Sequence, residues 1–268
     1  MTREILITGA AGEIGCVLRA GLGNGTRRLR MLDIRPQEPA REHEEVVTAD
    51  LADIDALRHA ARGIDCIVHL AGVPREGAWD AILPNNVIGT YNLFEAARQA
   101  GVKRVIFASS NHVVGYYRAT QSVGITEPAR PDSRYGVSKA CGEALGRMYA
   151  DKYGLEVACL RIGSFRARPE DARQLATWIS HRDMVELTRC CIDAAGFHFL
   201  VLYGVSNNTR NRWKNPHAAD VGYQPVDNAE QYAAELESKK PPAGDPAAEF
   251  HGGAFCGLEF TGDARRIE

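Results

Sequence analysis

The sequence lacks the features that mark secreted, membrane-spanning or nucleic-acid-binding proteins. Its seven cysteines are an odd number and none stands in a Cys-x-x-Cys pair, so we predict reduced thiols and a cytoplasmic location rather than a disulfide framework. No apolar run reaches the roughly 18 residues of a membrane span, and no basic segment followed by an apolar one opens the chain. The formal net charge of -2 gives no electrostatic reason to expect nucleic acid.

Metal-ligand spacing and internal repeats are also missing. The eight histidines never occur as His-x-x-x-His, so we predict no metal site. What remains is an ordinary globular composition, with 45% hydrophobic and 25% charged residues. At 268 residues and 29.3 kDa, the chain is long enough to bury the core of one large α/β domain.

A glycine-rich segment is the first positive signal. It contains Gly9, Gly12 and Gly15, between a strand predicted over 4–8 and a helix predicted over 16–22. Gly9 permits a tight turn, Gly12 lets the backbone approach a pyrophosphate, and Gly15 lets helix and strand pack closely. Three glycines alone could be only a turn, but the flanking strand and helix favour a dinucleotide site.

A carboxylate follows the next predicted strand, over 29–32. Asp33 lies 24 positions after Gly9, close to the ~20 expected for the acidic residue that binds the adenosine ribose. It would accept hydrogen bonds from the ribose hydroxyls and repel a 2′-phosphate, which favours NAD over NADP. Two alternatives stay open, because Asp33 could be a solvated charge at a strand end and the nearby Arg35 could serve NADP.

Strands and helices alternate through the first 162 residues. Further strands are predicted over 46–49, 66–72, 105–108 and 156–162, and further helices over 54–61, 81–100 and 135–153. This alternation predicts an α/β fold with a doubly wound, mostly parallel Rossmann sheet. We assign 1–162 to an NAD-binding domain that also carries the catalytic residues.

The last third of the chain follows no such alternation. Helices are predicted over 184–195 and 229–236, a strand over 198–203 and a linker over 241–246. We expect 163–268 to form a small substrate-binding region and C-terminal tail packed on the same domain. A nucleotide-sugar enzyme usually needs a larger substrate domain than this.

A hydroxyl and a Tyr–Lys pair form the predicted catalytic group. Ser110 is expected just past the end of the strand over 105–108, and Tyr135 and Lys139 are four residues apart, so they share one face of a helix. The Lys ammonium can lower the pKa of the Tyr, while the Ser holds a substrate oxygen between them. Tyr-x-x-x-Lys alone is a weak signal, which the glycine-rich segment strengthens.

Other polar or small residues are predicted around the cofactor. Asp50 and Leu51 follow the third strand, near where an adenine would lie. The small-residue turn ending at Gly72 lets the backbone approach the cofactor, or is only a turn. His69 lies on an apolar strand and is expected to be a buried structural histidine. Asn86 is a candidate polar group behind the site, although capping or solvent exposure is equally compatible.

The order of these motifs is typical of one superfamily. The segments 8–15, 69–72 and 86–90, together with Asp33, Asp50 and the Tyr135/Lys139 pair, resemble the extended short-chain dehydrogenase/reductases. The resemblance covers 4–162. It implies that NAD is bound by Gly9, Gly12, Glu13, Ile14, Gly15, Asp33, Asp50, Leu51, Leu70, Ala71, Gly72, Asn86, Tyr135, Lys139 and Ile162.

A narrower resemblance extends over essentially the whole chain. The segments 107–117, 130–132, 135–139, 161–164, 176–178 and 252–255 look like those of the bacterial uronate dehydrogenases. That family implies NAD-dependent oxidation of D-glucuronate or D-galacturonate at C1, which gives an aldarolactone. Tyr135, as phenolate, would take the proton of the anomeric hydroxyl. Lys139 would stabilise the phenolate and bind the nicotinamide ribose, and Ser110 would position the same oxygen.

The resemblance also implies the substrate contacts. Arg173 and Ser164 match the positions that hold the uronate carboxylate, and Arg173 would otherwise be interpreted as a solvated loop arginine. Asn111 and His112 are candidates for sugar hydroxyls, although His112 could instead only pack against the loop. Pro74 stands where the family is expected to have a Ser, so one hydroxyl contact stays open, as does the preference between glucuronate and galacturonate.

Two rival functions share parts of this pattern. A nucleotide-sugar epimerase or reductase of the same superfamily would use the same Ser, Tyr and Lys, and a redox sensor would bind NAD without turnover. Self-association through the helices over 81–100 and 133–153 is expected by resemblance only, so we predict a homo-oligomer with no nucleic-acid or membrane partner.

Overall fold

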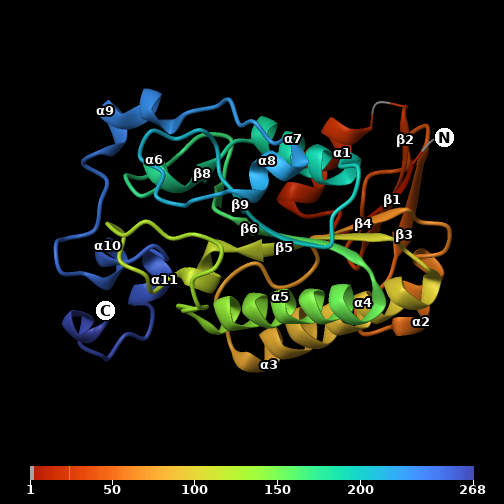
Figure 1. Ribbon diagram of the computed structural model, residues 1–268, viewed down its shortest axis with the longest axis horizontal. Helices are drawn as coiled ribbons and strands as arrows, with labels where there is room; N and C mark the ends of the chain where they lie inside the picture. Colours follow the sequence, from red (N-terminus) through yellow and green to blue (C-terminus); the bar gives the residue numbers. More distant parts are fainter. Residues whose placement is uncertain (1–2, 24) are drawn as a thin grey trace.

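The protein is described by a computed structural model that covers residues 3–23 and 25–268. Within these residues, seven strands form one sheet in the order β3-β2-β1-β4-β5-β6-β9 (Figure 1). The strands are β1 (Arg3–Thr8), β2 (Arg27–Asp33), β3 (Glu44–Thr48), β4 (Cys66–His69), β5 (Arg104–Ser110), β6 (Glu156–Ile162) and β9 (Phe199–Gly204). Each strand is parallel to its neighbours, and all the connections except the loop from β2 to β3 contain helices.

Helices cover both faces of this sheet (Figure 1). One face carries α2 (Ile54–Ala60), α4 (Gly89–Ala100) and α5 (Arg134–Tyr153), and the other carries α1 (Glu13–Leu22) and α7 (His181–Asp193). Successive side chains of a strand point to opposite faces. Leu6 therefore joins the apolar cluster under α2 and α4, while Ile5 and Ile7 join the cluster under α1 and α7. The predicted doubly wound, mostly parallel sheet is confirmed.

Several helix boundaries differ from the prediction, among them those of α1 and of the helix predicted over 81–100. α1 begins at Glu13 rather than at residue 16, because the Cys16 N–H already donates to the Gly12 carbonyl at 2.9 Å. The helix predicted over 81–100 consists of three consecutive segments. They are α3 (Trp79–Ile82), a π-helical segment (Leu83–Ile88) and α4, which begins at Gly89. The π-helical segment contains Pro84, which has no backbone N–H to continue a regular helical ladder.

Residues after 162 contribute both to the sheet and to the region beyond it. β9 extends the sheet beside β6. The remaining short elements are β7 (Ser164–Phe165), α6 (Gln174–Thr177), β8 (Trp178–Ile179), α8 (His217–Val221), α10 (Pro246–Glu249) and α11 (Ala254–Gly257). The single helix predicted over 229–236 is a 3₁₀ turn (Ala229–Tyr232) followed by α9 (Ala233–Leu236).

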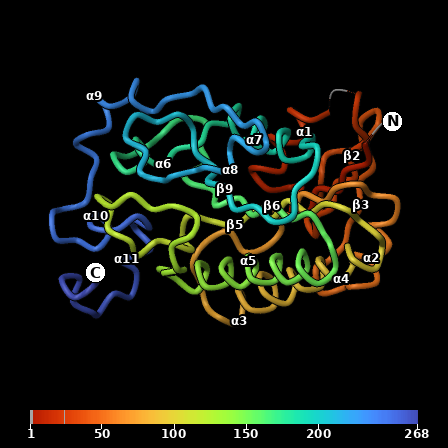
Figure 2. The backbone as a smooth tube through the Cα atoms, viewed as in Figure 1, coloured from red at the N-terminus to blue at the C-terminus, as the bar shows by residue number. Residues whose placement is uncertain are grey.

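The C-terminal segment packs against the long loop that follows β5, as the blue and yellow-green tubes of Figure 2 show. The His251 N–H donates to the Tyr117 carbonyl, and the Gly252 N–H donates to the Gly115 carbonyl, each at 2.9 Å. These bonds bring residues near 250 to the carboxyl ends of β5 and β6. The tail thus reaches the edge of the sheet where the predicted catalytic side chains lie.

No cross-links contribute to this fold. All seven cysteines are free thiols. Across residues 3–23 and 25–268, no helix combines the length and the apolar character that crossing a membrane would take. The two apolar layers against the sheet therefore supply most of the burial that stabilises the chain.

Candidate active site

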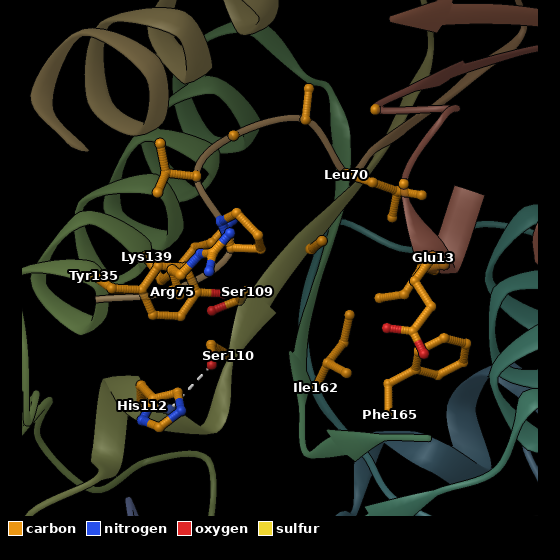
Figure 3. A pocket seen from close by; sticks show the side chains of 18 of the residues that line it. Glu13, Leu70, Arg75, Ser109, Ser110, His112, Tyr135, Lys139, Ile162 and Phe165 are labelled. Atoms are coloured by element: carbon orange, nitrogen blue, oxygen red, sulfur yellow. Dashed lines mark hydrogen bonds between the residues drawn. The ribbon is translucent and has the colours of Figure 1, made fainter. Parts of the chain in front are cut away.

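A cleft of about 850 Å³ opens at the carboxyl ends of the parallel strands. This is the edge at which doubly wound sheets bind their ligands. Of the predicted site residues, the cleft is lined by Gly9, Gly12, Glu13, Ile14, Gly15, Asp33, Asp50, Leu51, Leu70, Ala71, Gly72, Ser110, Asn111, His112, Tyr135, Lys139, Ile162, Ser164 and Arg173. Figure 3 shows Ser110, Tyr135 and Lys139 on one wall, facing Glu13 and Ile162 on the other.

The glycine-rich turn and α1 form one end of the cleft. Gly9 has φ +72°, and a Cβ there would lie 2.7 Å from the backbone nitrogen of Ala71, so only glycine suits this position. Gly12 is the N-cap of α1 and offers no side chain to the first N–H groups of that helix. An anion is therefore the natural partner for these donors, and the residues present fit a dinucleotide pyrophosphate.

Asp33 ends β2 beside this turn. Its carboxylate accepts hydrogen bonds from the Ala11 and Arg35 N–H groups, both at 2.9 Å. Burial alone would raise the pKa of Asp33, but these bonds and the Arg35 guanidinium lower it. The charged carboxylate at the rim of the cleft fits a ribose that donates its hydroxyls. Arg35 pairs with Asp33 at 3.3 Å rather than standing free for a 2′-phosphate.

Ser110, Tyr135 and Lys139 come together from β5 and α5. The sequence predicts Ser110 just beyond the end of the strand. In the structure it is the last residue of β5 and pairs with Ile162 of β6. Tyr135 lies in the first turn of α5, and Lys139 follows one turn later. The Lys139 ammonium lies 5.6 Å from the centroid of the Tyr135 ring.

Burial dominates the electrostatics of this group. It raises the pKa of the Tyr135 phenol to about 12, although a hydrogen bond with Ser110 lowers it. Burial also lowers the pKa of Lys139 to about 8. Lys139 is expected from the sequence to lower the pKa of Tyr135, but burial raises it, and Asp132 adds to the rise. Positive charge brought into the cleft by a ligand would favour the phenolate.

The start of α5 is held by two neighbouring segments. The N-cap Ser133 accepts a hydrogen bond from the Gly136 N–H at 3.0 Å. Glu76, from the loop after β4, accepts from the Tyr135 N–H at 2.9 Å and pairs with Arg134 at 2.8 Å. These contacts fix the backbone from which the Tyr135 ring projects into the cleft. Glu76 was not predicted, because its partner is distant in sequence.

Arg173 is a partly buried cation that forms no ion pair with any of the described residues. Its Nε donates to the His251 carbonyl at 2.8 Å and its Nη1 to Ser164 Oγ at 3.2 Å. With the Asn111 amide oriented to satisfy both its groups, Nη2 donates to Asn111 at 2.9 Å, and Asn111 donates to the Ile162 carbonyl. Burial lowers the pKa of Arg173. No carboxylate within the described residues forms an ion pair with it, so an anionic ligand would complete the site.

Asn86 is a polar group behind the cleft and is not among the described residues that line it. Its amide is buried behind the site, where it accepts from the Val73 N–H at 2.7 Å and donates to the Val73 carbonyl and to Ser138 Oγ. With donor and acceptor both satisfied internally, Asn86 shapes the loop after β4 instead of meeting a ligand. His69 is buried as expected, and burial together with Lys139 lowers its pKa to about 3.

Two residues beside His112 were not assigned from the sequence. Phe255 of the tail lines the cleft and stacks on the His112 ring with centroids 4.0 Å apart. Asp132, from the loop before α5, lies 2.7 Å from His112 Nδ1. Both occur in segments that carry the resemblance to uronate dehydrogenases, but no spacing rule links either to His112.

A buried ion pair supports the floor of the site. Arg161 of β6 donates to both carboxylate oxygens of Glu143 on α5, each at 2.9 Å, and Ser109 Oγ donates to the same carboxylate at 2.6 Å. Both charged side chains are nearly inaccessible to solvent. Each charge is therefore tolerated only because the other is present.

Arg161→Met should destabilise the fold strongly. It leaves the Glu143 carboxylate buried and unpaired, at an expected cost of about 3–5 kcal/mol in the free energy of unfolding. Urea denaturation would measure this cost. The matched double variant Arg161→Met/Glu143→Met removes both charges and should recover most of it. A loss below about 1 kcal/mol in the single variant would show that water reaches Glu143.

Known proteins resemble this chain along nearly its whole length. Residues 5–190 match the model of the NAD dependent epimerase/dehydratase family. The uronate dehydrogenase of Pseudomonas putida is 44% identical over 255 residues, which are 94% of this chain and 95% of the relative. A mutant uronate dehydrogenase from Agrobacterium tumefaciens, complexed with NAD, is 44% identical with a TM-score of 0.90, over 95% of this chain and 97% of that one. The glucuronic acid dehydrogenase of Chromohalobacter salexigens is 40% identical with a TM-score of 0.92, over 99% of this chain and 100% of that one.

Proposed function

This chain belongs to the NAD dependent epimerase/dehydratase family and, within it, to the uronate dehydrogenases, and from that premise we propose that it oxidises D-glucuronate or D-galacturonate at C1 with NAD. The product is an aldarolactone. The observation that carries this proposal is the partly buried guanidinium of Arg173, which has three protein partners and no anion in the described part of the chain. It lies in the same cleft as Ser110, Tyr135 and Lys139.

We propose that Tyr135 is the general base. As phenolate, it removes the proton of the anomeric hydroxyl, while Ser110 donates a hydrogen bond to the same substrate oxygen. Lys139, buried beside the Tyr135 ring, stabilises the phenolate by its charge. Since burial raises the pKa of Tyr135, proton transfer depends on positive charge beside the phenol, which Lys139 supplies.

Arg173 binds the carboxylate at the far end of the substrate. A guanidinium has five N–H bonds, and three are directed to His251, Ser164 and Asn111. The two that remain suit a carboxylate, which accepts hydrogen bonds in pairs. We propose that the region 163–268 thereby supplies the main specificity for uronates, with Asn111 and His112 facing the sugar hydroxyls.

We propose that NAD occupies the other half of the cleft. The N–H groups at the start of α1 hold its pyrophosphate, Asp33 accepts from the adenosine ribose, and Lys139 donates to the nicotinamide ribose. Bound NAD supplies the acceptor for the hydride that leaves C1. Because Asp33 is a fixed negative charge beside the ribose, NADP should be the poorer cofactor.

Absorbance of NADH tests this proposal directly. Purified protein is mixed with NAD or NADP and, separately, with glucuronate, galacturonate, glucose and a UDP-sugar. We expect rapid NADH formation with both uronates and NAD, and little with glucose. Turnover of the UDP-sugar alone would favour an epimerase or reductase, and NAD binding without turnover of any sugar would favour a redox sensor. Either result would overturn the proposal.

We also propose a cytoplasmic homo-oligomer. Ile88 and Tyr91 near the start of α4, and Val137 and Met148 on α5, are large apolar side chains exposed on neighbouring helices (Figure 1). A second copy would cover them. Light scattering should give a mass of at least two 29.3 kDa chains, and a single-chain mass would contradict self-association. The proposed cytoplasmic location rests on the cysteines, because free thiols are typical of a reducing compartment.

A further inference from the structure

We infer that Asp132 is a positioning residue that fixes the tautomer of His112, so that His112 Nε2 accepts a hydrogen bond from one hydroxyl of the sugar. The inference rests on the proposed function and deepens it, because it makes one hydroxyl of the uronate a determinant of specificity. The competing interpretation is that His112 only packs against the loop.

The contact between the two residues indicates which nitrogen of the neutral ring carries the proton. His112 Nδ1 lies 2.7 Å from Asp132 Oδ2. An ionised carboxylate can only accept a hydrogen bond, so Nδ1–H must donate. A neutral imidazole then has a lone pair on Nε2. Within residues 3–23 and 25–268, Nε2 has no hydrogen-bond partner, and the ring lines the cleft beside Ser110 (Figure 3).

Asp132 is held so that it cannot turn away. Its side chain is 0% exposed, and Oδ1 accepts from Ser133 Oγ at 2.6 Å. The carboxylate is enclosed by the backbone of Gly115 and Gly252, and a Cβ at either glycine would overlap Oδ2. The tail that carries Gly252 therefore closes over Asp132 and keeps its orientation. A carboxylate with this little freedom can impose one tautomer on its partner.

The plane of the His112 ring is fixed as well. Phe255 stacks on it at an interplanar angle of 16°, and Tyr135 meets it edge-on at 73°, with centroids 5.8 Å apart. Rings on two sides and a carboxylate on Nδ1 leave the imidazole little rotational freedom. The position of Nε2 is then set, and in a neutral ring the tautomer decides whether Nε2 accepts or donates.

This arrangement selects a donor on the substrate. A sugar hydroxyl can donate to Nε2, whereas hydrogen or fluorine at the same carbon cannot. An epimer whose hydroxyl points elsewhere leaves Nε2 without a hydrogen bond. Such an epimer should bind more weakly, because a polar atom that loses water and gains no partner costs free energy. His112 and Asp132 thus recognise a hydroxyl of the hexuronate, while Arg173 recognises its carboxylate.

Asp132→Asn tests the inference because it keeps the shape and reverses the polarity. The new amide can donate to Nδ1, so Nδ1 becomes the acceptor and Nε2–H a donor directed at the substrate. We expect KM for the uronate to rise about tenfold or more, with KM for NAD unchanged. Nitrogen-15 spectra, assigned with His112→Gln, should show the proton on Nδ1 in the wild type and on Nε2 in the variant.

A series of deoxy- and fluoro-hexuronates identifies the partner hydroxyl. In the wild type, one analogue should lose about 10- to 100-fold in kcat/KM. In Asp132→Asn, the loss for that analogue should fall to less than about threefold, because the hydrogen bond is already absent. Phe255→Leu separates the two supports of His112, since it removes the stacked ring and keeps the Asp132 contact, so the analogue should still lose activity.

Three results would overturn the inference. They are equal losses for that analogue in the wild type and in Asp132→Asn, an unchanged uronate KM in Asp132→Asn, and a wild-type proton on Nε2. Thermal denaturation of each variant separates these results from misfolding. Failure of the proposed function is distinguishable, because the wild type would then form no NADH from any uronate.

Discussion

Tyr135→Phe should abolish uronate oxidation and leave NAD binding intact. Phenylalanine keeps the ring against His112 and Phe255, so the packing that shapes the cleft is preserved. It removes the only phenol among the cleft-lining residues that the structure describes. General base catalysis contributes about 10²- to 10⁴-fold, so kcat should fall by at least this factor while the Kd for NAD, measured by calorimetry, changes little.

The matched control is Tyr116→Phe. The Tyr116 hydroxyl donates to the Cys256 carbonyl at 3.4 Å, and its side chain does not line the cleft in the described part of the chain. This variant should keep kcat within about twofold, since an exposed or partly buried neutral hydrogen bond contributes little. If Tyr135→Phe retained a tenth of the wild-type turnover, another group would have to be the base.

The electrostatics of the same phenol predict the direction of the pH dependence. In the proposed mechanism the active form is the phenolate, and burial raises the pKa of Tyr135 to about 12, so the protonated form dominates at neutral pH. Activity should therefore rise with pH through the neutral range. Lys139, whose pKa is lowered to about 8, loses its charge as pH passes that value, which opposes the rise.

The half of the cleft around the glycine-rich turn could be predicted from sequence because its determinants are local. Gly9 and Asp33 each follow or end a strand, and neighbouring parallel strands end at the same edge of a sheet. Tyr135 and Lys139 are one helical turn apart, which fixes their common face. In each case a short spacing determines the position in space.

The substrate half depends on contacts between distant segments. Arg173 is oriented by the His251 carbonyl, 78 residues later in the chain, and His112 is covered by Phe255 from the same tail. No local period predicts such packing. Asn86 illustrates the same difficulty, because an amide satisfied by Val73 cannot be distinguished by spacing from one that faces a ligand.

Arg173→Lys should lose uronate oxidation while keeping the charge. Lysine is a single ammonium that cannot reach His251, Ser164 and Asn111 together and still present two parallel donors. Hydrogen bonds to charged groups contribute about 1.5–3 kcal/mol each, so kcat/KM for galacturonate should fall by about 10²-fold or more. The low activity with the corresponding neutral aldose should change far less, since that sugar has no carboxylate to bind.

The comparison that decides the role of Arg173 is the ratio of uronate to aldose activity, because misfolding would lower both together. Arg166→Lys is the control, since Arg166 also lines the cleft but is exposed and paired with Glu13 and Glu170. Its ratio should stay within about twofold of the wild type, as exposed ion pairs are weak. If Arg173→Lys kept the wild-type ratio, the guanidinium would be a structural cation held by His251 and Ser164, and the carboxylate would have to bind elsewhere in the cleft.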